Sequence, residues 1–180
     1  MKFFAGLVTL AFALAVSASA TPFKRDAATV ERDIAAISAQ VGTLNAAITR
    51  FGNSKSATDA DAIHRDSQEL EGRINKATAD TRNSKDFNED EGRTILREFQ
   101  ALAPEIVATL QNLDNQHHNL AAERGRDAVV ESDLKTLNGD TVAFENALLD
   151  KEPADDRAAV RAADDRINAA FAEAIRTFAS

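Results

Sequence analysis

Residues 30–51, VERDIAAISAQVGTLNAAITRF, carry the pattern that indicates the fold of this chain. Their large apolar side chains recur at alternating steps of four and three residues, which places them on one face of an α-helix. These side chains are Val30, Ile34, Ile37, Val41, Leu44, Ile48 and Phe51. Gly52, Asn53 and Ser54 follow directly, and such residues are typical of a helix end and a turn. The stretch predicts an amphipathic helix with one apolar stripe.

Similar apolar stripes continue along the chain and predict further helices over about residues 58–81, 88–125, 127–149 and from 153 to the end. Asn88 and Glu91 have the spacing of a capping box, and Pro153 suits a first helical position. Pro104 lacks the N–H that would bond to the Gln100 carbonyl, so we expect a kink in the third helix. The sequence therefore predicts an all-α fold, an up-and-down bundle of about five amphipathic helices. Short connections make successive helices antiparallel neighbours in such a bundle.

The composition agrees with a single helical domain. The chain has 180 residues, of which 36 are Ala, 7 are Gly and 3 are Pro. Acidic residues (29) outnumber Lys and Arg (21), and a surface with this excess repels phosphate backbones. We therefore expect no nucleic-acid partner. Cysteine is absent, which excludes disulfides, zinc–thiolate sites and cysteine nucleophiles.

The N-terminus has the features of an export signal. Lys2 precedes an apolar run over residues 3–16, and Ala18-Ser19-Ala20 has the small residues that a signal peptidase recognises. This run is too short for a transmembrane helix, and no later stretch is apolar enough for one. Lys24-Arg25 resembles a kexin-type processing site, the alternative being an ordinary charged pair. We predict a signal peptide over residues 1–20, a short propeptide over 21–25 and a secreted helical domain over 26–180.

Several stripe positions near the middle of the predicted helices hold small or polar side chains, namely Ser67, Ala77, Thr141, Ala163, Ala170 and Ala174. Such positions either allow helices to approach closely or leave an apolar cavity between them. A cavity of this kind accepts an apolar guest such as a fatty acid. The predicted lipid-contacting residues are those at mid-helix stripe positions: Ile37, Val41, Leu44, Leu70, Ile74, Phe99, Ile106, Leu110, Leu137, Phe144, Ile167 and Phe171.

Metal-dependent or hydrolytic chemistry has little support in the sequence. Asp61 and His64, like Asp114 and His117, have the i, i+3 spacing that di-iron bundles use with Glu and His. Asp reaches less far than Glu, however, and no inward-facing Glu completes such a set. A Gly-x-Ser-x-Gly elbow is also absent. We therefore predict a non-enzymatic protein with no catalytic residues, no metal site and no cofactor.

Five short motifs, taken in order, resemble one known family. They are DIAAI at residues 33–37, LAPEI at 102–106 with Leu110, SDLKTL at 132–137, KEP at 151–153, and INAAF at 167–171 with Phe178. Each motif alone is weak, but together they extend over residues 26 to 180. On them the chain resembles the fungal hydrophobic surface-binding protein A family, also called the cell-wall galactomannoprotein family.

The resemblance implies two related functions. Members of this family adsorb to hydrophobic surfaces outside the cell, in some cases helping a polyesterase, and others hold a fatty acid inside the bundle. The chain differs from many members in its high charge and in ending at Ser180, without a Ser/Thr-rich stalk, which favours free secretion over attachment to the cell wall. We expect a secreted protein that binds fatty acids, similar apolar lipids or hydrophobic surfaces. The alternative is a recruiting protein that adsorbs to hydrophobic solids and brings a secreted esterase to them, with no internal ligand.

Overall fold

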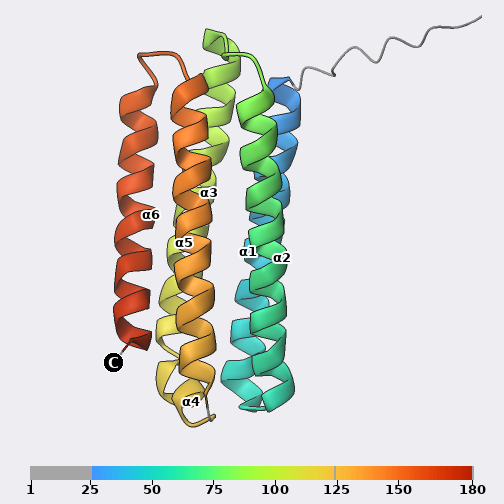
Figure 1. Ribbon diagram of the computed structural model, residues 1–180, viewed down its shortest axis with the longest axis vertical. Coiled ribbons are helices and arrows are strands. Elements are labelled where there is room, and N and C mark those ends of the chain that lie inside the picture. The colour runs from blue at the N-terminus through green and yellow to red at the C-terminus, as the bar shows by residue number, and fades with distance from the viewer. Residues whose placement is uncertain (1–25, 124, 180) are drawn as a thin grey trace, which may run out of the picture.

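The computed structural model describes residues 26–123 and 125–179, and residues 1–25, with the expected signal peptide and propeptide, lie outside this part. The described residues form six α-helices and no β-strand, which confirms the predicted all-α bundle (Figure 1). None of these helices is long and apolar enough to cross a membrane. The helices are α1 (Ala27–Ser54), α2 (Ala57–Asn83), α3 (Glu89–Asp114), α4 (His117–Ala121), α5 (Arg126–Lys151) and α6 (Arg157–Phe178).

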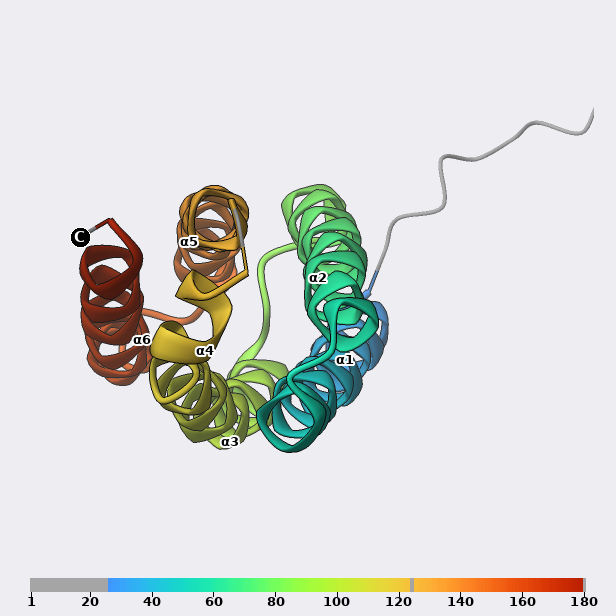
Figure 2. The same cartoon turned by 90° about the horizontal axis from the view of Figure 1, so that it is seen from below.

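The five long helices, α1, α2, α3, α5 and α6, form a closed ring. Around this ring the order is α1, α2, α5, α6, α3 and back to α1, so each long helix packs against two others (Figure 2). The pairs α1–α2 and α5–α6 are antiparallel neighbours, as predicted (Figure 1). Helices α2 and α3 follow one another in the chain but are not neighbours, because α1 lies between them. The prediction is wrong for this pair and for the successive long helices α3 and α5, since an apolar stripe specifies a buried face and not the helix that covers it.

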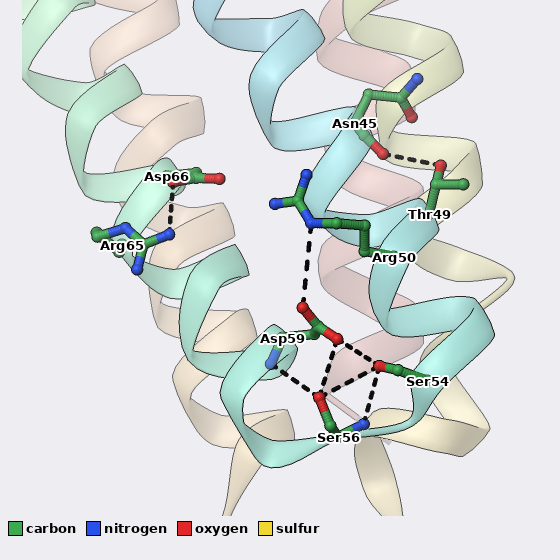
Figure 3. A network of polar contacts seen from close by, with 8 residues as sticks. All are labelled: Asn45, Thr49, Arg50, Ser54, Ser56, Asp59, Arg65 and Asp66. Carbon is green, nitrogen blue, oxygen red and sulfur yellow. Dashed lines mark hydrogen bonds and ion pairs between the residues drawn. The ribbon is translucent and has the colours of Figure 1, made fainter.

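The turn between α1 and α2 is held by a small polar network (Figure 3). Lys55 ends α1 in the left-handed region, with φ of 52°. The hydroxyl of Ser56 caps α2 by accepting from the Asp59 N–H at 3.2 Å, and it donates to the Asp59 carboxylate at 2.9 Å. Ser54 donates to the same carboxylate, and Arg50 lies 4.0 Å from it. These contacts fix the reversal of direction that places α2 beside α1.

The predicted third helix is divided in the structure, but not at Pro104. Its capping box is present, because Asn88 Oδ1 accepts from the Glu91 N–H at 3.1 Å and the Glu91 carboxylate accepts from the Asn88 N–H at 2.9 Å. Helix α3 then continues through Pro104, whose side chain is exposed, so the expected kink is not confirmed. The break comes at residues 115–116, after which the chain forms the five-residue α4.

The last long helix begins later than expected. Pro153 does not occupy the first helical position, because α6 starts at Arg157 after Asp156. Glu152 and Pro153 instead pack on the first turns of α3, where a Cβ atom on Gly92 would lie 2.6 Å from each of them. The Arg157 side chain donates to the Glu152 carbonyl at 3.1 Å. Pro153 therefore lies against α3 and outside α6.

Candidate functional site

An apolar cavity of about 40 Å³ lies inside the ring, and every one of the five long helices contributes to its wall. Nine of the twelve predicted lipid-contacting residues line it: Ile37, Val41, Leu44, Leu70, Ile74, Ile106, Leu110, Leu137 and Phe171. All nine lie on the apolar stripes that the spacing of four and three residues predicts. The structure therefore brings these nine residues together at one cavity, and their contact with a lipid stays a prediction.

The other three predicted residues, Phe99, Phe144 and Ile167, lie in the core outside the cavity. The rings of Phe99 on α3 and Phe144 on α5 meet edge to face, with centroids 6.3 Å apart and planes at 74°. Ile167 on α6 is fully buried. These large side chains fill the middle of the ring along the bundle axis. The cavity therefore lies nearer the end of the bundle that carries α4.

The shift toward α4 brings in apolar residues that the sequence analysis did not select. They come from the last turns of α1 and α3 and the first turns of α2 and α5: Ile48, Ile63, Leu113, Val130 and Leu134. All five belong to the same predicted stripes. They were missed because the cavity was expected at the middle of every helix.

The small stripe residues divide into three groups. Ser67 on α2 and Thr141 on α5 line the cavity, in agreement with the expectation that small residues border open space. Ala77, Ala163 and Ala174 are buried but lie away from the cavity, and so allow close helix packing. Ala170 is only partly buried and borders a surface depression between α3 and α6.

One side chain of the cavity wall is ionisable among the residues described, and it is Asp133 on α5. Its Oδ2 lies 2.8 Å from Nδ1 of His64 on α2. Burial raises the pKa of the Asp133 carboxyl, and the hydrogen bond and charge of His64 oppose this shift. Asp133 stands at i+3 in the run Val130, Asp133, Leu134 and Leu137, so a polar residue on the stripe was the signal that could have revealed it.

The His64–Asp133 pair resembles the base and orienting acid of a hydrolase, but it lacks the other parts. A nucleophile must lie within hydrogen-bond reach of the base. Ser67 is one turn from His64, yet within the described part of the chain His64 bonds only to Asp133. The surrounding backbone belongs to continuous helices, whose internal N–H groups are already bonded and offer no oxyanion hole. Within the described residues, the pair therefore has no hydrogen-bonded nucleophile beside it.

The two Asp–His pairs of the sequence do not converge on a common site. Asp61 forms an ion pair with Arg126, while the ring of His117 packs edge to face on Phe178 at 4.9 Å. Over residues 26–123 and 125–179, no three metal-ligating side chains come together.

Besides Asp133, a group of buried acids lies between α5 and α6, apart from the cavity. Burial and the nearby Asp164 charge raise the pKa of Glu145 to about 8, although Asn168 donates to its carboxylate at 3.1 Å. Burial and the Asp165 charge raise the pKa of Asp164 to about 6. At the α5–α6 connection, burial and Asp156 raise the pKa of Glu152 to about 7.

Solved structures with this fold contain fatty acids. AFMP4P in complex with palmitic acid is 29% identical, with a TM-score of 0.81 over 85% of this chain and 99% of that one. Ligand binding domain 2 of the Penicillium marneffei MP1 protein, complexed with multiple arachidonic acids, is 23% identical with a TM-score of 0.79 over 88% and 99%. Ligand binding domain 1 of the same protein, also with arachidonic acids, is 17% identical with a TM-score of 0.67 over 82% and 99%. At 23% and 17% identity the likeness concerns the fold alone.

The family is established from the sequence itself. No curated protein matches the chain in a sequence comparison. The sequence pattern described as hydrophobic surface binding protein A matches residues 27–150, which is more than half of the chain. The chain belongs to the hydrophobic surface binding protein A family.

Proposed function

We propose that this protein is a secreted, non-enzymatic carrier that holds the acyl chain of a fatty-acid-like lipid between its five long helices. The apolar cavity to which all five helices contribute is the observation that carries this proposal. The palmitic acid in the complex of AFMP4P, which has the same fold, supports it. The nine predicted residues in the cavity wall are the proposed lipid contacts, and their role is apolar contact alone.

The bundle must expand to take up such a ligand. A cavity of about 40 Å³ holds only a few water molecules, whereas an apolar cavity that binds benzene measures about 150 Å³. Transfer of an acyl chain out of water contributes about 0.8 kcal/mol per CH₂, on the order of 10 kcal/mol for a long chain. This free energy is available to offset the separation of packed helices. Phe99, Phe144 and Ile167 are the next side chains that a long acyl chain would meet.

Adsorption to hydrophobic solids, with recruitment of a secreted esterase, is the second candidate function, and the family name favours it. Among the described residues, Val142 is the one large hydrophobic side chain that is exposed. Over residues 26–123 and 125–179, the outer face of the closed bundle therefore offers a solid no cluster of large exposed hydrophobic side chains. Adsorption in this family member would require the helices to turn their apolar stripes outward, as amphipathic helices do at an interface.

Secretion is part of the proposal. Residues 1–20 have the pattern of a signal peptide, and residues 21–25 end in the basic pair. Asp26 caps α1 by accepting from the Thr29 N–H at 3.1 Å. A mature chain that starts at Asp26 would thus keep the complete helical domain and its cap.

Native mass spectrometry of the delipidated protein tests the acyl-binding function. After addition of palmitic acid, we expect a mass increase of one or more fatty acids on a folded protein. A folded protein that takes up no fatty acid but coats a hydrophobic surface would overturn the internal site and favour adsorption.

A further inference from the structure

The cavity wall carries a negative group where an acyl ligand would lie. Asp133 is the one ionisable side chain among the described residues of the wall, and its side chain is only 11% exposed. A carboxylate in an apolar wall costs free energy, so packing alone does not account for it. Its hydrogen bond to His64, whose side chain is 40% exposed, extends from the cavity to the protein surface at the α2–α5 interface.

The surroundings of Asp133 are acidic. Glu71 on α2 is close enough that burial and the charges of Asp133 and Asp140 all raise its pKa. On this side His64 is the hydrogen-bond partner of Asp133, and the nearby Arg126 on α5 is paired with Asp61. The cavity residues that the described parts of α1, α3 and α6 supply are uncharged. A ligand carboxylate at this wall would meet an acid and no unpaired cation.

From this arrangement we infer that Asp133 selects against ionised fatty acids, so that the preferred ligands are acyl lipids with an uncharged head, such as a monoester of glycerol or a fatty alcohol. The inference rests on the proposed acyl-binding function and adds the class of head group. A hydroxyl group can donate a hydrogen bond to the Asp133 carboxylate, whereas an ionised carboxylate is repelled by it. A fatty acid is accepted more readily once it is protonated.

The test compares lauric acid with its glycerol monoester, which has the same acyl chain. Each competes with one fluorescent fatty-alcohol probe at about pH 5 and about pH 8, because the lauric acid carboxyl ionises between these values in a lipid-like environment. For the unchanged protein we expect at least tenfold tighter binding of the monoester at about pH 8 and a smaller preference at about pH 5. Equal binding of the two lipids at about pH 8 would overturn the head-group selectivity alone. Binding of neither lipid would overturn the proposed function as well.

Asp133→Asn tests the assignment of this selectivity to one residue. The variant removes the negative charge and keeps a similar shape, so the preference for the monoester at about pH 8 should fall about tenfold. Asp140→Asn is the matched control, because it removes one charge from a half-buried position two turns further along α5, where Asn75 donates to it at 2.8 Å. A similar fall in both variants would mean that overall charge sets the preference. Weaker binding of lauric acid by Asp133→Asn would place the head group on His64 instead and overturn the inference.

Discussion

Phe99 of α3 and Phe144 of α5 touch edge to face across the inside of the ring, with centroids 6.3 Å apart, although the two helices are not neighbours around it. At most 2% of the surface of either residue is exposed to solvent. The pair closes the ring on the side of the cavity away from α4. It therefore limits how far an acyl chain can extend along the bundle axis.

Replacing Phe144 with Ala should open this barrier. We expect a loss of about 3–5 kcal/mol in the free energy of unfolding, because a large buried side chain is removed. We also expect a shift of acyl-chain preference toward longer chains, measured by competition within a series of fatty alcohols. Phe51→Ala is the control, since Phe51 is fully buried but does not line the cavity or touch Phe144. A similar shift in the Phe51 variant would show that general loosening, and not the barrier, sets the length.

Filling the cavity should weaken lipid uptake. Ser67→Val adds apolar volume to a cavity of about 40 Å³, so we expect lipid binding to weaken about tenfold. The free energy of unfolding should change by no more than about 1–3 kcal/mol, the usual cost of overpacking. Isothermal titration with a fatty alcohol and thermal unfolding measure the two effects.

Two control variants test whether the added volume inside the cavity is what weakens lipid binding in Ser67→Val. Ser67→Ala removes the same hydroxyl without adding bulk and should bind lipid normally. Ala170→Leu adds bulk in the surface depression between α3 and α6, outside the cavity, and should also bind normally. Weakened binding in Ala170→Leu but not in Ser67→Val would place the ligand at the α3–α6 depression.

The buried acids between α5 and α6 predict a dependence of stability on pH. The pKa values of Glu145 (about 8) and Asp164 (about 6) are raised above their ordinary values of 4.5 and 3.8. The folded state therefore binds protons more tightly than the unfolded state. Their contribution to stability is fully present below about pH 4 and is lost as pH rises to about 8. We expect the melting temperature to fall over this range in calorimetry.

Glu145→Gln should reduce this fall, because the amide stays neutral at every pH. At about pH 8 each kcal/mol gained raises the melting temperature by roughly 2–4 °C in a domain of this size. Glu69→Gln, at an exposed position on α2, is the control and should leave the pH profile unchanged. A Glu145 variant with the original profile would mean that other groups cause the fall.

The apolar stripes were enough to predict the helices and most of the core. A stripe such as Ile34, Ile37 and Val41 shows which face is buried, because burial requires this spacing. It does not identify the neighbouring helix, and so the ring order, with α1 between α2 and α3, could not be read from it. The position of the cavity depends on where Phe99 and Phe144 meet, which is a relation between helices distant in sequence.

Charged site residues were harder to predict than apolar ones. His64 was noticed as one half of a metal-like pair with Asp61, but its partner in the structure is Asp133, 69 residues away. The position of Asp133 on an apolar stripe marks it as unusual, but nothing local in the sequence identifies His64 as its partner. The interruption of the third helix was also misplaced: it was expected at Pro104, but α3 continues through Pro104 and ends at Asp114.

Pro104 has a second consequence for uptake. As proline it donates no hydrogen bond to the Gln100 carbonyl, so α3 is weakest at this level. The α3 residues of the cavity wall begin directly after it, at Ile106, and continue to Leu113. If the ring expands to admit an acyl chain, this segment is the part of α3 that can bend away with the smallest loss of helical hydrogen bonds.

Pro104→Ala should therefore stabilise the closed bundle and weaken lipid uptake. The restored hydrogen bond should raise the free energy of unfolding by about 1–3 kcal/mol, measured by chemical denaturation. Fatty-alcohol affinity should fall, because expansion must now break that bond. Gly139→Ala is the matched control: a Cβ at this position on α5 meets no atom within 4 Å, so the change stabilises a helix by about 1 kcal/mol without touching α3. Equal losses of affinity in both variants would attribute the effect to global stability, and unchanged affinity in Pro104→Ala would show that the wall does not move about Pro104.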